Sequence, residues 1–475
     1  MSVLSTLFQD FSARLCSSEF LNDARHPDHP SAFSRYRKLP LPTLVAIMLT
    51  GMRMSIQAEL DMFFAHLRQQ AQLVHEVSEQ AFSQARAKLS LTAIPRLNDW
   101  LIRRAEQDRF VPHWHGLRLV AADASILRFG LRASHVNRAA IADQTLFGLF
   151  LPGPDLMLAA SLHSTHERGE RQFLFEHLDR LSAGDLLLLD RGYPCRWLVA
   201  VLNHRSINFC MRVDNSGTGF TCVRQFLRSG ERERIVMLRA PDRQDARDDE
   251  CPRQPQRVRL IRHITPNGEH RVLMTNLFDE QRFPALGFGE LYHQRWGIEE
   301  AFKRLKHRLN LEHVSGLSQQ AVAQDVAAKI VCDNLQALTA LTAHADANLP
   351  ADERINHAYV HTALKPLLPL LLRGGAIGRK LGSLLRNLLA LIARRTYRHR
   401  ENLSKPRAPR QKPHNCHEGM ADAPEYEKHN IDTRLFVYSR RLRGVHMLLF
   451  RFFVSFTVRA DRGVADLANC PQCNP

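Results

Sequence analysis

Residues 185–193 read Asp-Leu-Leu-Leu-Leu-Asp-Arg-Gly-Tyr, a short apolar run that ends at Asp190 and is followed by a glycine. Such a run predicts a strand buried in a sheet. Residues 117–123, Leu-Arg-Leu-Val-Ala-Ala-Asp, have the same form and end at Asp123. Either aspartate alone is more often a turn or capping residue. Neighbouring strands would nevertheless bring the two carboxylates together, and paired carboxylates bind Mg²⁺, which prefers oxygen ligands.

Further strands are expected around these two, and together they predict an α/β fold. The apolar segments that indicate them are 156–162, 208–213, 257–264 and 270–277. The last two flank Asn267 and Gly268, a pair that strongly favours a hairpin turn. The charged, proline-containing stretch 241–257 predicts a loop. Helical periodicity returns over about 285–311 and 319–342.

One helical segment carries a stripe of charged and aromatic residues. Residues 291–306 read Leu-Tyr-His-Gln-Arg-Trp-Gly-Ile-Glu-Glu-Ala-Phe-Lys-Arg-Leu-Lys. At about 100° per residue, the side chains on one face are Tyr292, Arg295, Glu299, Lys303 and Lys306. A solvated ion-pair ladder explains Glu299 and Lys303 but not the Tyr and Arg before them. A third metal-binding carboxylate flanked by phosphate-holding Arg and Lys explains the whole stripe, and it favours Glu299 over Glu300, which is turned off this face.

The N-terminal region, residues 1 to about 112, is expected to be helical. A helix over 78–89, with Ser78 as its N-cap, places Phe82, Ala85 and Leu89 on one face. The polar side chains on the other faces are Gln80, Ser83, Gln84, Arg86 and Lys88. Gln and Ser can read base edges, and Arg and Lys can hold phosphates, so the pattern suits a DNA-recognition helix. Taken alone, this stretch is better explained as an ordinary amphipathic surface helix.

Composition indicates a polyanionic partner. The 475 residues, enough for about three domains, include 65 Lys and Arg against 48 Asp and Glu, a net charge of +17. Nucleic acid is the first candidate partner, although ribosomal and membrane-surface proteins share this charge. We expect no secretion signal and no membrane contact, since no apolar run approaches the length of a spanning helix. Nine scattered cysteines argue against a disulfide framework and indicate a reducing cytoplasm.

The C-terminal region, 346–475, is predicted to be basic and helical. No Asp or Glu occurs between Arg354 and Arg400, where arginines punctuate apolar helical positions. Residues 402–424 are rich in proline and predict a linker. Cys470 and Cys473, together with residues 414–417 (His-Asn-Cys-His), would suit a zinc site only in combination. Chance placement explains them better, because zinc sites usually show two paired ligand knuckles.

The stripe also has the spacing Tyr-x₂-Arg-x₃-Glu-x₆-Lys at Tyr292, Arg295, Glu299 and Lys306. This resembles the signature of DDE transposases of the bacterial "insertion sequence 4" family. The segments Asp123-Ala124-Ser125 and Asp190-Arg191-Gly192-Tyr193 resemble the first and second aspartate motifs of that family, and 78–89 resembles part of its N-terminal region. The resemblance runs from about residue 40 to 345.

The resemblance implies a ribonuclease-H-like catalytic core over 113–345, with a β-rich insertion over about 214–273. A helical DNA-end-binding domain (1–112) and the basic C-terminal region (346–475) would flank it. The resemblance further implies that Asp123, Asp190 and Glu299 are the catalytic residues and metal ligands. They would hold two Mg²⁺ ions, for which Mn²⁺ can substitute.

The resemblance also implies the partners. These are double-stranded DNA, as element ends and target, and a second copy of the chain in a homodimeric synaptic complex in the bacterial cytoplasm, associated with the nucleoid. The predicted DNA contacts are Tyr292, Arg295, Trp296, Lys303, Lys306, Gln80, Gln84 and Arg86. Family members form a hairpin on the transposon end and stack a flipped base on an aromatic residue of the insertion. This insertion has no Trp, so Phe220, Phe226 or Trp296 would have to take that role.

Two other functions compete with transposition. One is a non-catalytic DNA-binding remnant of a transposase, which would be expected to lack one of the three acids; all three are present. The other is a ribonuclease-H-fold nuclease that repairs or degrades DNA. The stripe from Arg295 to Lys306 and the N-terminal region favour transposition.

Overall fold

The computed structural model describes residues 3–35, 37–129, 140–141, 143–165, 169–213, 220–265, 268–373 and 379–398. All of them belong to one compact unit, Met1–Asn415. The predicted linker and the candidate zinc ligands lie outside the described residues. No helix in the described ranges is both long and apolar enough to cross a membrane.

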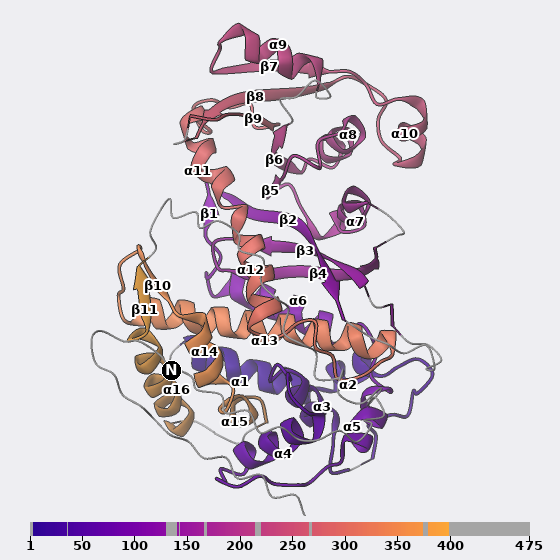
Figure 1. Cartoon of the computed structure of the whole chain (residues 1–475), viewed down its shortest axis with the longest axis vertical. Helices are drawn as coiled ribbons and strands as arrows, with labels where there is room; N and C mark the ends of the chain where they lie inside the picture. Colours follow the sequence, from indigo (N-terminus) through magenta and orange to yellow (C-terminus); the bar gives the residue numbers. More distant parts are fainter. Residues whose placement is uncertain are drawn as a thin grey trace, which may run out of the picture. The chain divides into compact units, whose positions relative to one another are not determined.

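The strands form one mixed sheet in the order β4-β3-β2-β5-β6-β9-β8-β7, with β1 beside β2 (Figure 1). Their bounds are β1 His113–Trp114, β2 Leu117–Arg128, β3 Asp143–Leu151, β4 Leu156–Ser164, β5 Asp185–Leu189, β6 Asn208–Val213, β7 Glu233–Leu238, β8 Gln256–Ile264 and β9 His270–Thr275. β2, β3 and β4 are antiparallel neighbours, whereas β2, β5 and β6 run parallel. The first five strands of this order make a ribonuclease-H-like core, so the expected fold class is confirmed.

β2 is longer than the sequence indicated. It was expected to end at Asp123, but it continues to Arg128 because its second half pairs with β3. Its parallel pairing with β5 stops at Ala121 and Leu188. Asp123 therefore lies inside β2 but beyond the end of the parallel partner, where the side chain is no longer fully covered.

The segment between β6 and the helices that follow extends the sheet. β9 pairs antiparallel with β6, and β8 and β7 continue outward. The predicted hairpin joins β8 and β9, with Ile264 opposite His270; Asn267 lies outside the described residues. Two helices accompany these strands, α9 (Thr221–Ser229) and α10 (Arg243–Asp248). The loop predicted over 241–257 thus contains a helix, which begins where the Asp242 carboxylate accepts a hydrogen bond from the Asp245 amide at 3.0 Å.

Helices lie before and after the sheet in sequence. The first group is α1 Val3–Cys16, α2 Ser18–Ala24, α3 Leu41–Met48, α4 Ile56–Leu67, α5 Glu79–Arg86 and α6 Ala93–Gln107. Within or after the sheet come α7 Glu170–Phe175, η1 Leu178–Arg180, α8 Arg196–His204, η2 Ala285–Gly287, α11 Phe288–His293, α12 Trp296–His307, α13 Gln319–Asp346, α14 His357–Leu364, α15 Leu368–Arg373 and α16 Arg379–Ala393, with the short hairpin β10 Glu353–Ile355 and β11 Thr396–Arg398.

The long helix α13 joins these groups (Figure 1). It contacts β4 and α6 as well as α12, α14 and α16, and most of its residues are buried. α1 contacts α13, α15 and α16, and α3 contacts α15. The N-terminal and C-terminal helices therefore share one hydrophobic core rather than packing separately.

Candidate active site

Two aspartates lie at the edge where the parallel strands end. Asp123 faces Gly148 of β3 across the ladder, and its Oδ1 accepts a hydrogen bond from the Ala124 amide at 2.9 Å. Asp190 directly follows β5, and its Oδ1 accepts one from the Gly192 amide at 2.7 Å. The parallel alignment of β2 with β5 places both carboxylates at the same end of the sheet, as predicted from the sequence.

Glu299 reaches this edge from α12, a helix that packs on β2 and β3. Between Glu299 and Asp123 lies the guanidinium of Arg295. It donates to Glu299 Oε1 at 2.8 Å and lies 3.5 Å from Asp123 Oδ2. The Arg295 side chain is only 7% exposed, so this positive charge belongs to the interior of the site. Its Nε has no hydrogen-bond partner among the described residues.

The helix that carries these residues is interrupted. The sequence predicted one continuous helix with Tyr292, Arg295 and Glu299 on a single stripe, but α11 ends at His293 and α12 begins at Trp296. Tyr292 is buried at 4% exposure, and the Arg295 guanidinium lies 5.9 Å from the centre of its ring and 5.7 Å from that of Trp296. The break lets Arg295 turn inward against the carboxylates.

The pKa of Asp123 depends on burial and on the charges of the other two acids. The pKa of Asp123 is raised to about 6, chiefly by burial and in smaller part by the negative charges of Asp190 and Glu299. The Ala124 amide and the positive charge of Arg295 act in the opposite direction. A carboxyl whose pKa is set by burial and like charges is the behaviour expected where acids converge for chemistry.

Two residues near this site were missed from the sequence. Burial raises the pKa of Glu170, the first residue of α7, to about 6, and the charges of Asp123 and Asp190 contribute. Tyr193, which follows Asp190 in the Asp-Arg-Gly-Tyr motif, is completely buried, and its hydroxyl has no partner among the described residues. Tyr193 was quoted in that motif but given no role. The sequence spacing around Glu170 does not identify it as a site residue. Glu170 reaches the site only because α7, the helix after β4, packs back on the sheet.

The lysines of the predicted stripe do not form an ion-pair ladder with Glu299. Lys303 pairs with Glu300 at 2.5 Å rather than with Glu299. Lys306 donates from Nζ to the Ile126 carbonyl of β2 at 2.7 Å. Trp296 is 42% exposed. Glu299, not Glu300, faces the aspartates, as its register predicted.

The predicted DNA-contacting residues of α5 differ in exposure. Gln80, Ser83 and Gln84 are exposed on α5. The assignment of Arg86 to a DNA-contacting face is corrected: its side chain is 4% exposed and pairs with Asp325 of α13 at 2.9 Å. It also donates to the Ala321 carbonyl at 2.7 Å and lies over the Phe82 ring. A buried arginine with these partners serves packing of α5 on α13.

The aromatic candidates for base stacking are also separated. Phe226 lies on the buried face of α9 and is fully buried, so it cannot receive a base, which corrects that alternative. Phe220 is partly buried against the core. Trp296 is the most exposed of the three and lies beside Arg295.

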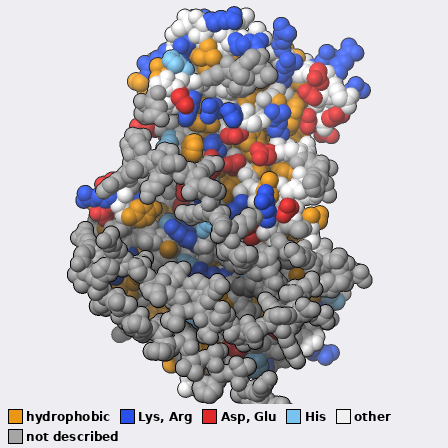
Figure 2. All heavy atoms as spheres, viewed as in Figure 1, with side chains coloured by type: hydrophobic (Ala, Val, Ile, Leu, Met, Phe, Trp, Pro, Cys, Tyr) orange, Lys and Arg blue, Asp and Glu red, His pale blue; other side chains and the backbone are white. Residues whose placement is uncertain are grey.

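Acidic and basic side chains are unevenly spread on the face in Figure 2, where Lys and Arg gather over the part formed by α9, β7 and β8. Exposed arginines there include Arg228, Arg232 and Arg239. This basic surface belongs to the same sheet that carries the aspartates.

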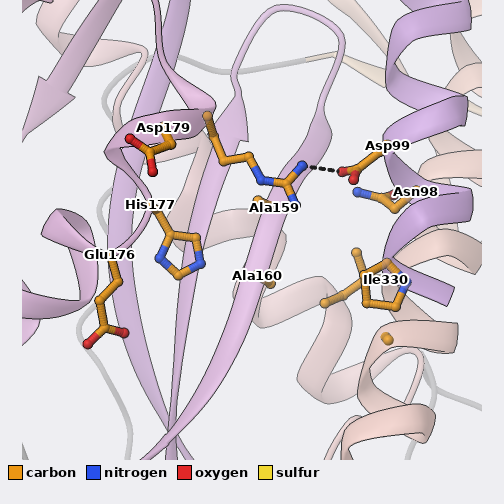
Figure 3. A pocket seen from close by; sticks show the side chains of 11 residues that line it. Asn98, Asp99, Ala159, Ala160, Glu176, His177, Asp179 and Ile330 are labelled. Carbon is orange, nitrogen blue, oxygen red and sulfur yellow. Dashed lines mark hydrogen bonds and ion pairs between the residues drawn. The ribbon is translucent and has the colours of Figure 1, made fainter. Parts of the chain in front are cut away.

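A cavity of about 330 Å³ lies elsewhere, between α6, β4, η1 and α13 (Figure 3). Arg180 crosses it to pair with Asp99 at 2.7 Å, and His177 and Glu176 line another side. None of the three site acids lines it. The cavity is therefore separate from the candidate active site.

Comparison with known proteins finds similarities to transposases. Residues 115–335 match the family described as "Transposase DDE domain". Transposase InsG for insertion sequence element IS4 of Escherichia coli (strain K12) is 23% identical over 274 residues, which cover 54% of this chain and 60% of that protein. The chain thus matches about three fifths of the length of this curated relative. A solved piggyBac transposase synaptic complex with hairpin DNA shares 10% identity, with coverage of 80% and 85% and a TM-score of 0.39.

Proposed function

Because residues 115–335 are a DDE transposase domain of the insertion sequence 4 type, we propose that this protein binds the terminal inverted repeats of an insertion sequence and cuts and joins DNA there by cut-and-paste transposition. The observation that carries the proposal is the convergence of Asp123, Asp190 and Glu299 from β2, the end of β5 and α12. The resemblance seen in the sequence is confirmed; the reaction on DNA is our proposal.

The donor set suits divalent cations. Family members use such ions, and we propose two Mg²⁺ ions here, with Mn²⁺ as a substitute. Carboxylate oxygens are the ligands that Mg²⁺ prefers, and the mutual repulsion that raises the pKa of Asp123 is what a cation relieves. Within the described ranges, no three His, Cys, Asp or Glu side chains already form a coordination sphere. Arg295 instead supplies the positive charge between Asp123 and Glu299.

The residues of the chain divide the work. Asp123, Asp190 and Glu299 would hold the ions, which when bound activate water or a DNA 3′-OH and neutralise charge at the scissile phosphate. Arg295 orients Glu299 and Asp123 and keeps a positive charge between their carboxylates. Lys306 and Lys303 contribute phosphate contacts around it, whereas Tyr292 is 4% exposed and packs its ring against the Arg295 guanidinium. Trp296, exposed beside Arg295, is the residue we propose for bracing a displaced nucleotide.

DNA binding away from the cleavage point falls to two further surfaces. Gln80 and Gln84, with Ser83, are proposed to read the element ends. Exposed arginines near the end of the described chain are proposed to hold DNA without sequence preference or to support assembly of two protomers; they are Arg386, Arg394, Arg395 and Arg398.

The central test is cleavage of DNA carrying the element ends in Mg²⁺. Asp123→Ala, Asp190→Ala and Glu299→Ala are each expected to abolish cleavage while retaining end binding, because the basic surfaces remain. Glu300→Ala is the matched control, since that carboxylate pairs with Lys303 on the exposed side of the helix. Cleavage by Glu299→Ala at the wild-type rate would sink the assignment. A nuclease without end preference would instead cut scrambled DNA equally well.

A further inference from the structure

Glu170 begins α7, the short helix that follows β4 and packs back on β2 and β3. The next residue fixes its position: Arg171 Nε donates to the Gly192 carbonyl at 2.9 Å. Gly192 is the residue whose amide binds the Asp190 carboxylate. The start of α7 is therefore tied to the turn that presents Asp190, and Glu170 enters the same end of the sheet as Asp123.

Glu170 has no ion pair with any described residue and remains accessible to solvent. Glu299 differs, because Arg295 compensates its charge at 2.8 Å. The charges that act on Glu170 are those of Asp123 and Asp190. Like charges beside Glu170 disfavour its ionised form, and a bound cation would relieve that repulsion.

Tyr193 provides an independent observation. Its side chain is 0% exposed, and its hydroxyl has no hydrogen-bond partner among the described residues. Tyr193 belongs to the turn that presents Asp190, where its amide donates to the Asp190 carbonyl at 3.4 Å. Burial raises the pKa of its hydroxyl, and the charges of Glu170, Asp123 and Asp190 act in the same direction. A buried donor left unpaired lowers the stability of the folded state. This donor is thus available for a carboxylate oxygen of the cluster or for an oxygen of a bound ligand.

We propose that Glu170 is a fourth carboxylate of the active site, which holds a divalent cation together with Asp123 and Asp190, and that the Tyr193 hydroxyl orients this group. The inference rests on the proposed function, since it concerns the same metal-dependent site. Glu299 and Arg295 then form one side of the site and Glu170 and Tyr193 the other. In this proposal Tyr193 is a positioning residue, because its hydroxyl would act through the carboxylates and not on DNA itself.

The test measures cation binding by the full chain, without DNA. Free Mn²⁺ is titrated against wild type, Glu170→Gln and Tyr193→Phe, and the thermal unfolding midpoint is followed in parallel, because an ion that binds only the folded state raises it. Glu170→Gln should weaken Mn²⁺ binding about tenfold or more, and Tyr193→Phe by a comparable or smaller factor. Asp179→Asn is the control: its side chain is 90% exposed and pairs with Arg205, so Mn²⁺ binding should be unchanged.

The outcomes separate the inference from the proposed function. Loss of Mn²⁺ binding in Asp123→Asn with wild-type binding in Glu170→Gln overturns the fourth carboxylate alone. Absence of Mn²⁺ binding in the wild type overturns both. A Glu170→Gln variant whose unfolding midpoint falls without cation, while its Mn²⁺ affinity is unchanged, assigns Glu170 a structural role and also overturns the inference.

Discussion

At the scale of single residues, Arg295 and Lys306 have different surroundings although both belong to the transposase signature. Arg295 is buried between Asp123 and Glu299. Lys306 extends along β2 and donates to the Ile126 carbonyl. A guanidinium held by two carboxylates acts mainly on the site itself, whereas an ammonium on the rim can also contact a DNA phosphate.

This difference gives a prediction for DNA binding and cleavage. Arg295→Ala should lower cleavage roughly 10²-fold or more, because a preorganised charge beside the reacting groups is lost. Arg295→Lys keeps the positive charge but not the planar guanidinium, so its cleavage rate should lie between those of wild type and Arg295→Ala. Lys306→Ala should flatten the dependence of log affinity on log salt by about 0.9. Filter binding at several salt concentrations measures the salt dependence of DNA affinity, and a time course measures the cleavage rate. A salt dependence that is flattened in Arg295→Ala but not in Lys306→Ala would contradict the roles given to these two residues.

At the scale of elements, α12 is held on the side away from the acids by Arg304. Its guanidinium pairs with Asp333 of α13 at 2.8 Å and with Asp155, in the turn between β3 and β4, at 2.6 Å. Because β3 pairs with β2, this pairing connects the helix of Glu299 to the strand of Asp123. Gly148 and Gly297 allow the close approach, since a Cβ at Gly148 would meet Phe302 at 3.3 Å and one at Gly297 would meet Phe150 at 3.0 Å.

Arg304→Met should therefore destabilise the fold by about 3–5 kcal/mol, because it leaves the buried Asp333 carboxylate without its partner and removes the arginine from the half-buried Asp155. Chemical denaturation of full-length protein measures the change. Arg234→Met is a suitable control, as that residue pairs with Glu231 on the surface, where such pairs contribute about 0–1 kcal/mol. Equal effects of the two substitutions would show that the buried pairing does not hold α12.

The elements also show what the sequence could and could not predict. The apolar runs ending at Asp123 and Asp190 predicted the strands, and helical register distinguished Glu299 from Glu300. The burial of Arg86 was not predictable, because it depends on partners distant in sequence, and helical periodicity gave no sign of the interruption between His293 and Trp296. Asp325, for example, lies 239 residues after Arg86. A local pattern marks a charged side chain as exposed unless its partner is known.

At the scale of the whole described unit, N-terminal and C-terminal helices meet at His361 of α14. This side chain is 3% exposed, and its Nδ1 lies 3.1 Å from Gln336 Nε2 of α13. Burial lowers the pKa of His361 to about 4, and the positive charges of Arg53 and Lys365 add to the effect, while Glu59 opposes it. Its ordinary pKa is 6.5, so the unfolded chain binds this proton first as pH falls.

The free energy of unfolding should therefore lose about 3 kcal/mol through His361 as pH falls from about 6.5 to about 4, with the full contribution present above 6.5. The sign follows from a depressed pKa in the folded state. Chemical denaturation at several pH values in this range measures the change. In His361→Gln the free energy of unfolding should fall by about 3 kcal/mol less than in wild type. Parallel curves for the two proteins would mean that His361 is protonated equally in both states.

End recognition is also best tested in the whole chain. The helices of residues 1–112 share their core with α13, α15 and α16, so a fragment lacking those partners would expose apolar surface. On α5, Gln80, Ser83 and Gln84 are exposed while Arg86 anchors the helix to α13. Amides and hydroxyls discriminate bases, whereas Lys and Arg mainly hold phosphates.

A full-length triple variant, Gln80→Ala with Ser83→Ala and Gln84→Ala, should therefore lose its preference for end DNA over scrambled DNA. Its binding to scrambled DNA and its salt slope should stay unchanged, because no phosphate-binding cation is removed. Competition gel shifts measure the preference. The matched control is Arg386→Ala with Arg394→Ala, two exposed arginines near the end of the described chain, which should weaken binding to both DNAs alike. If the control loses the preference and the triple variant keeps it, recognition resides in the C-terminal helices, and α5 is a surface helix whose only role is packing.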